Sequence, residues 1–157
     1  MNNFGKLLSS VLFCELIGLI STSFTITSIP TWYAGLIKPP FSPPNWIFGP
    51  VWTILYCLMG IAAYLVWEKG IKIRKVKIAL KYFLIQLFFN FIWSPLFFGF
   101  HLPLIALFDI FILLVMIVII MKQFHGISKL AFYLLIPYLL WVSFATLLNL
   151  SVVVLNK

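Results

Sequence analysis

Long runs of apolar residues fill most of this chain and are separated by short polar connections. Five runs hold about 20 residues or more, the length an α-helix needs to cross a ~30 Å hydrocarbon core at 1.5 Å per residue. Lipid leaves backbone N–H and C=O groups no water to bind, so spans of this kind fold as helices. The pattern predicts five transmembrane helices, at about residues 7–28, 46–67, 80–100, 103–122 and 130–153.

Composition supports a membrane protein. Of 157 residues, 64% are hydrophobic and 9% are charged, against roughly 25% charged in soluble domains. The length allows one domain, so residues 1–157 are expected to form a single all-α bundle of five spans. The net charge is +8, which in such a protein reflects topology and lipid headgroups rather than nucleic acid.

The basic residues are distributed unevenly between the two sides of the predicted membrane. Lys38 and Lys157 are the only ones on the side of the first loop and the C-terminus. The other side carries Lys6, Lys69, Lys72, Arg74, Lys75, Lys77, Lys81, Lys122 and Lys129. This bias predicts a cytoplasmic N-terminus and an outer C-terminus in a bacterial cell membrane. The 69–81 cluster is also suited to anionic lipid headgroups, although setting topology alone explains it equally well.

The first connection, residues 30–45, contains five prolines. Proline fixes φ and lowers the entropy lost in adopting one conformation, so this loop is expected to be stiff. It also carries Trp32, Tyr33 and Phe41. Trp and Tyr gather at membrane interfaces in any case. A rigid aromatic loop is nevertheless more than anchoring requires, and it would serve as a lid over a pocket between helices.

Three of the predicted helices carry aromatic, amide and small residues on one face. These stripes are Gly49, Trp52, Tyr56 and Gly60; Gln86, Asn90, Trp93 and Phe97; and Trp141, Ala145 and Asn149. Helical spacing places each stripe on a single face, and span direction places all three in the half of the membrane beneath the first loop. Packing between helices is one explanation. The whole set favours a pocket for a flat, large and mostly apolar ligand.

Prolines should also interrupt the helices. Pro103 suits the first turn of the fourth helix, where its missing N–H costs nothing. Pro95 and Pro137 lie inside spans and should kink them.

Candidate chemistry elsewhere is sparse. Glu15 and Asp109 lie inside spans and are functional candidates, or protonated groups hydrogen-bonded to a neighbouring helix. Cys14 and Cys57 are expected to pack as reduced side chains. The sequence shows no metal-ligand spacing, no nucleophile–base pair and no phosphate-binding loop, so no metal and no conventional enzyme is predicted.

The chain resembles the translocator protein family, also known as tryptophan-rich sensory or peripheral benzodiazepine receptor proteins. The resemblance covers nearly the whole length. The matching residues are Trp32-Tyr33-Ala34-Gly35-Leu36, Lys38-Pro39, Pro43-Pro44, Phe48-Gly49-Pro50-Val51-Trp52, Leu55-Tyr56, Gln86-Leu87, Asn90, Trp93, Phe97-Phe98-Gly99, Ala106-Leu107, Asp109, Pro137-Tyr138, Trp141, Phe144-Ala145-Thr146 and Leu148-Asn149.

The resemblance implies five tightly packed helices, usually in a homodimer, and a pocket closed by the first loop. It implies binding of porphyrins such as protoporphyrin IX and of benzodiazepine- or isoquinoline-type ligands. It assigns the ligand-lining role to Tyr33, Trp52, Asn90, Trp141 and Ala145, and the predicted site also includes Pro43, Trp93, Phe97 and Asn149. The sterol motif of animal members is not matched, because no basic residue follows Tyr138 within five positions.

Three functions remain open at this point. The first is a membrane receptor or translocator for porphyrins. The second is light- and oxygen-dependent breakdown of a bound porphyrin, in which Trp52 and Trp141 would serve as electron donors and porphyrin would be the substrate. The third is a non-catalytic sensor that acts through a partner protein. No other cofactor is predicted.

Overall fold

The computed structural model describes residues 3–157, which fold into helices and connections without a strand. Five helices in this range are long and apolar enough to cross a membrane, which confirms the predicted all-α, five-span class. The elements are α1 (Asn3–Ser28), η1 (Tyr33–Gly35), η2 (Asn45–Ile47), α2 (Phe48–Trp67), α3 (Arg74–Ser94), η3 (Pro95–Gly99), α4 (Pro103–His125), α5 (Lys129–Leu134) and α6 (Ile136–Leu155).

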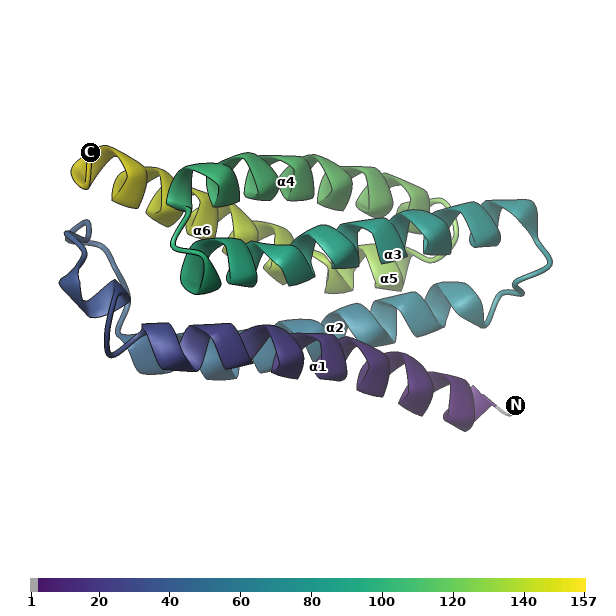
Figure 1. The fold of residues 1–157 in the computed structure, drawn as a ribbon. Coiled ribbons are helices and arrows are strands. Elements are labelled where there is room, and N and C mark those ends of the chain that lie inside the picture. The colour runs from purple at the N-terminus through teal and green to yellow at the C-terminus, as the bar shows by residue number, and fades with distance from the viewer. Residues whose placement is uncertain (1–2) are drawn as a thin grey trace.

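The spans form an elongated bundle (Figure 1). Helices α1 and α2 run side by side, and α4 packs against both α3 and α6. The N-terminus and the α2–α3 and α4–α5 connections gather at one end, termed the basic end here. The first loop, the α3–α4 connection and the C-terminus gather at the other, the loop end. The basic residues therefore segregate between the two ends as the sequence indicated.

Several helices extend beyond the apolar segments that predict them. Helix α3 begins at Arg74 rather than near residue 80, and α4 continues to His125 rather than ending near residue 122. The added residues are mostly basic or polar. Hydropathy marks the part of a helix that suits lipid, whereas Lys, Arg and Gln are good helix formers that continue it into the headgroup region.

The prolines begin or interrupt helices at the positions that the sequence indicated. Pro103 occupies the first turn of α4. Pro95 opens the π-helical turn η3, in which the Phe100 N–H donates to the Pro95 carbonyl at 2.8 Å. The fifth span is interrupted at Leu135, two residues before Pro137, and so consists of α5 and α6. Proline removes a helical donor and clashes with the preceding turn, which explains both irregularities.

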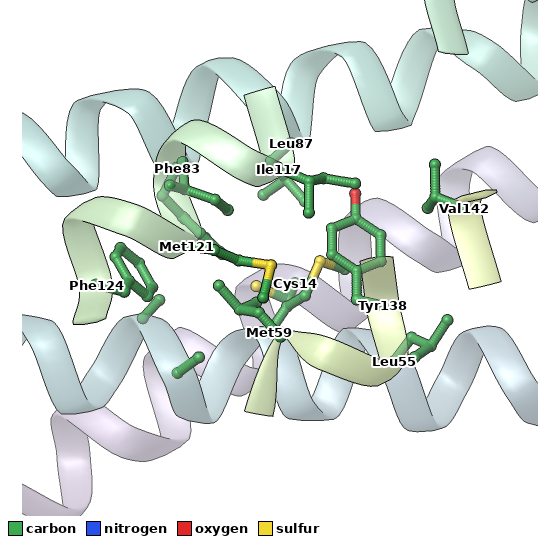
Figure 2. Packing of buried hydrophobic residues seen from close by; sticks show 14 of the residues in the cluster. Cys14, Leu55, Met59, Phe83, Leu87, Ile117, Met121, Phe124, Tyr138 and Val142 are labelled. Atoms are coloured by element: carbon green, nitrogen blue, oxygen red, sulfur yellow. The ribbon is translucent and has the colours of Figure 1, made fainter. Parts of the chain in front are cut away.

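The middle of the bundle is a closely packed apolar core. Figure 2 shows Cys14 beside Met59, and both side chains are fully buried, Cys14 as a free thiol. Gly60 lets α1 and α2 approach closely, because a Cβ there would lie 2.6 Å from Val11 Cα. The Ser10 hydroxyl donates to the Gly60 carbonyl at 2.8 Å across the same seam. Small residues commonly allow helices to pack this closely in membranes.

Candidate functional site: an aromatic pocket beneath the first loop

A pocket lies between the helices in the half of the bundle nearest the loop end. Its cavity volume is about 100 Å³, below the roughly 300–1,000 Å³ typical of small-molecule sites, so a large ligand requires the walls or the loop to move outward. This outer pocket is lined by Gly18, Ser21, Thr22, Thr25, Tyr33, Phe48, Gly49, Trp52, Tyr56, Asn90, Trp93, Ser94, Phe97, Phe98, Trp141, Ala145, Leu148, Asn149 and Val152.

Eight of the nine predicted site residues meet in the outer pocket. They are Tyr33, Trp52, Asn90, Trp93, Phe97, Trp141, Ala145 and Asn149. Pro43 is the exception and does not line it. A turn closed by the Ser42 N–H and the Pro39 carbonyl, 3.0 Å apart, places the Phe41 ring 6.3 Å from that of Phe144. This part of the loop therefore packs on α6 instead of covering the pocket.

Eight of the nineteen residues that line the pocket are aromatic. The Trp93 and Phe97 rings stack with centroids 5.2 Å apart, and the Phe48 ring meets Trp141 edge-on at 5.9 Å. Trp52 packs beside Tyr56 with centroids 5.6 Å apart. These separations are normal for favourable aromatic pairs. The rings pack against one another, and the surface they present to the hollow is mostly apolar.

The side-chain amides of Asn90 and Asn149 already form hydrogen bonds that join helices. Asn149 accepts a hydrogen bond from Trp93 Nε1 at 3.1 Å and donates to the Pro103 carbonyl at 2.8 Å, which joins α6 to α3 and α4. Sequence reasoning left open whether the amides pack helices or face a pocket. Asn149 does both, and it uses one acceptor site and one of its two N–H donors within the protein.

Asn90 belongs to a chain of buried polar groups. Tyr56 Oη donates to Asn90 Oδ1 at 2.5 Å, and Asn90 Nδ2 donates to Tyr138 Oη at 2.9 Å. Tyr138 Oη in turn donates to Gln86 Oε1 at 2.8 Å. The Asn90 amide carries a second N–H, so it keeps one donor for a ligand while the chain fixes its orientation.

Trp141 supplies an unpaired polar group in the wall. Its indole Nε1 is buried and has no hydrogen-bond partner among residues 3–157. A buried N–H without a partner costs roughly 1–3 kcal/mol. A ligand acceptor that reaches this N–H would recover that cost, so Trp141 is a candidate for polar recognition.

Helix α1 contributes a wall that the stripe analysis missed. Gly18, Ser21, Thr22 and Thr25 line the pocket. Thr25 Oγ1 and Ser94 Oγ are hydrogen-bonded at 2.8 Å, and Ser94 Oγ also donates to the Ser21 carbonyl at 3.0 Å. These contacts fasten α1 to α3. The spacing of small and hydroxyl residues at 18, 21, 22 and 25 was the available signal, since it places them on one helical face.

The first loop closes the pocket through Tyr33, which is buried. Its ring lies 5.5 Å from that of Phe98 in η3. Lys38 Nζ donates to the Tyr33 carbonyl at 2.8 Å and lies 4.8 Å from the centre of the Tyr33 ring. Burial raises the pKa of the Tyr33 phenol above its usual value. A raised tyrosine pKa keeps the phenol neutral through physiological pH.

Two further contacts hold the loop against the bundle. The Ile37 backbone makes two hydrogen bonds with the Asn156 side chain, each 2.9 Å long, near the end of α6. Trp32 stacks on His101 of the α3–α4 connection, with ring centroids 4.4 Å apart. The loop is therefore fixed at both sides of the pocket, as a lid requires.

The two intramembrane acids lie outside this pocket. Asp109 is buried in α4, yet neither of its carboxylate oxygens has a hydrogen-bond partner among residues 3–157. The alternative that it bonds to a neighbouring helix is therefore wrong for the described chain. Glu15 is only half-buried on α1. Within residues 3–157, no three His, Cys, Asp or Glu side chains gather as a metal site would need.

These features define a polytopic α-helical membrane protein with a lidded aromatic pocket. The TspO/MBR family model matches residues 10–155, and the chain belongs to this family. It is 45% identical over 155 residues to the tryptophan-rich protein TspO of Archaeoglobus fulgidus, covering 98% of this chain and 99% of that one. It is 42% identical to the human translocator protein, covering 75% and 70%. It is 34% identical to the tryptophan-rich sensory protein of Cereibacter sphaeroides, covering 88% and 85%.

Proposed function

We propose that this protein is a membrane receptor and translocator for porphyrins of the protoporphyrin IX type. The same pocket would accept benzodiazepine- and isoquinoline-type ligands. The observation that carries the proposal is an aromatic pocket of matching character, closed by a fixed loop and offering one unpaired indole N–H. A flat, conjugated ligand gains stacking and apolar burial on such walls.

The mechanism assigns distinct tasks to the lining residues. The porphyrin ring stacks against Trp52 and Trp141, and Tyr33 covers it from the loop. Trp141 Nε1 and the second N–H of Asn90 donate to ligand acceptors. Ala145 leaves the space that the ring occupies, since its side chain is the smallest on the α6 wall.

Titration with protoporphyrin IX in detergent or nanodiscs tests the site. Binding is measured from the shift of the porphyrin absorbance band. Trp52→Ala combined with Trp141→Ala should weaken binding at least about tenfold, since that factor is 1.4 kcal/mol and each aromatic contact contributes roughly 0.5–1.5 kcal/mol. Trp46→Ala combined with Trp67→Ala removes as many tryptophans outside the pocket and is the matched control. Equal affinity in the two double variants would refute the site.

A second function, light- and oxygen-dependent porphyrin breakdown, is favoured by the arrangement of oxidisable rings. Trp52 lies 5.6 Å from Tyr56 and 6.5 Å from Tyr138, measured between ring centroids. Such a row can carry an electron to an excited porphyrin, with molecular oxygen as the oxidant. Illumination in air should bleach bound porphyrin faster in the wild type than in Trp52→Phe or Trp141→Phe. Identical bleaching rates, or bleaching that persists without oxygen, would exclude this activity.

The orientation and assembly are proposed with the same function. We expect the basic end in the cytoplasm and the loop end outside the cell membrane, because nine of the eleven basic residues belong to the basic end. The variants Lys72→Cys and Lys157→Cys test this orientation through their reaction with a membrane-impermeant thiol reagent. Only Lys157→Cys should react in intact cells.

A homodimer is also expected, and light scattering of the purified protein measures its mass. A sensor acting through a partner would instead bind porphyrin without moving it across liposome membranes.

A further inference from the structure

A second hollow lies in the basic half of the bundle. It is a groove with a cavity volume of about 520 Å³, and its surface is almost entirely apolar. This inner groove is lined by Ser9, Ser10, Phe13, Ala63, Trp67, Ile71, Leu80, Phe83 and Leu84. Its walls come from α1 and α3, and Ala63 and Trp67 on α2 complete the lining. None of these residues belongs to the outer pocket.

Large side chains along the groove remain exposed in the single chain. Phe13, Ile71 and Leu84 are each about half exposed. In a membrane such a surface is covered by lipid or by another span. The lining residues cover about one helical turn on each of α1, α2 and α3, and α1 diverges from α3 toward the basic end (Figure 1). The almost entirely apolar lining suits a lipid acyl chain.

Cations stand at the end of the groove on all three of its sides. Lys6 lies one helical turn before Ser10 and Phe13, on the same face of α1. Lys77 lies one turn before Leu80 on α3, and Lys72 directly follows Ile71 in the connection. Each is displaced from the groove-lining residues toward the basic end. The three charges therefore lie beyond the apolar groove, on the side of the basic end.

Among residues 3–157, these three lysines have no ion-pair partner. The single ion pair among residues 3–157 joins Lys69 to Glu68, with Nζ and Oε1 3.5 Å apart. Lys75 is also engaged, since its Nζ donates to the Gly126 carbonyl at 2.7 Å. Lys6, Lys72 and Lys77 are exposed or half-buried and form no such contact in the described chain. Their charge is available to an external anion.

We propose that the inner groove is a specific binding site for an anionic phospholipid. One acyl chain occupies the groove between Phe13, Trp67 and Leu84, and the phosphate headgroup is held by Lys6, Lys72 and Lys77. Apolar burial holds the chain, and the three cations select the anionic headgroup over a zwitterionic one. This site is independent of porphyrin binding in the outer pocket.

Brominated lipids test the proposal, because bromine quenches tryptophan fluorescence at short range and Trp67 lines the groove. The protein is reconstituted in phosphatidylcholine vesicles that contain a small fraction of brominated phosphatidylglycerol or, separately, of brominated phosphatidylcholine. The contribution of Trp67 is the difference between wild type and Trp67→Phe. It should be quenched at least several-fold more effectively by the anionic lipid. Equal quenching by the two lipids would overturn the proposal.

Charge variants identify the headgroup contacts. Lys6→Gln with Lys77→Gln should reduce the preference for phosphatidylglycerol by about fivefold per lysine, the factor expected for a basic side chain near an anionic surface. Lys122→Gln with Lys129→Gln makes the same charge change at the same end, away from the groove, and should keep the preference. If both double variants lose it equally, only general surface charge is involved and the specific site is disproved. A brominated sterol that quenches Trp67 better than phosphatidylglycerol would also overturn the assignment.

Discussion

The outer pocket and the inner groove are formed by the same three helices but differ in chemistry. On α1 the groove uses Ser10 and Phe13 and the pocket begins at Gly18. On α2 the corresponding residues are Ala63 and Tyr56. The pocket adds α6 and the loop, which close it and give it indole and amide groups. The groove has no such cover and is rimmed by lysines.

A layer of core separates the two hollows. Cys14, Met59 and Gln86 lie between the groove-lining and pocket-lining residues of α1, α2 and α3, and all three are fully buried. Neighbouring turns of one helix can therefore line both a closed aromatic pocket and an open apolar groove. What differs is which additional elements cover the face.

The largest expected effect comes from the close contact between α1 and α2, two of the helices that contribute to both hollows. Gly60→Ala places a Cβ 2.6 Å from Val11 Cα, so α1 must move away from α2. Overpacking of this kind costs roughly 1–3 kcal/mol. We expect a clear fall in Tm in detergent, with loss of both porphyrin and lipid binding. Gly49→Ala on the same helix meets nothing within 4 Å and is the control. If the two variants have equal Tm, the close seam does not exist.

The core layer between the hollows is expected to be the next most sensitive. Tyr138→Phe removes a hydroxyl that accepts from Asn90 and donates to Gln86. Hydrogen bonds between helices in membranes contribute about 0.6 kcal/mol on average and up to about 1.7. Losing two should lower the free energy of unfolding by about 1–2 kcal/mol. Tyr133→Phe, at an exposed position, should change nothing. A neutral Tyr138→Phe would argue against the polar chain.

Two pocket tryptophans should respond in opposite ways to the same substitution. Trp93→Phe breaks a hydrogen bond to Asn149 and should lower stability by up to about 1 kcal/mol. Trp141→Phe removes an N–H that has no partner, so stability should be kept while porphyrin binds roughly 2- to 10-fold more weakly, the value of one hydrogen bond. Unfolding and titration on the same samples compare them. Reduced stability in Trp141→Phe would show that its N–H is already satisfied.

The smallest effect is expected at the lid. Asn156→Ala removes both hydrogen bonds to Ile37 and frees one side of the loop from α6. Porphyrin should dissociate a few-fold faster, with little change in the unfolding free energy, since loop contacts at the surface contribute modestly. Stopped-flow displacement measures the rate, and Lys157→Ala is the neighbouring control. An unchanged rate would mean that the lid opens elsewhere.

The sequence predicted the spans well because lipid makes hydropathy and length decisive. It also predicted the positions of the helical irregularities, since Pro95 and Pro137 act through local geometry. The start of α3 at Arg74 was not predictable from hydropathy, because a helix can extend beyond its apolar segment.

The candidate site was predictable where residue type and helical periodicity coincide, as for Trp52 and Trp141. Partners were not predictable. Asn149 forms hydrogen bonds with Trp93 and with a backbone carbonyl that only the fold brings near. Pro43 was placed in the site from its loop, yet the direction of a proline-rich loop depends on tertiary contacts such as that of Phe41 with Phe144.

The central claim is that porphyrin occupies the outer pocket and not the inner groove, and a pair of alanines tests it directly. Ala145 lines the pocket and Ala63 lines the groove, so leucine at either position fills one hollow with the same added volume. Titration with protoporphyrin IX should show at least about tenfold weaker binding in Ala145→Leu, a difference of 1.4 kcal/mol, and unchanged binding in Ala63→Leu. Weaker binding in Ala63→Leu with unchanged binding in Ala145→Leu would contradict the account.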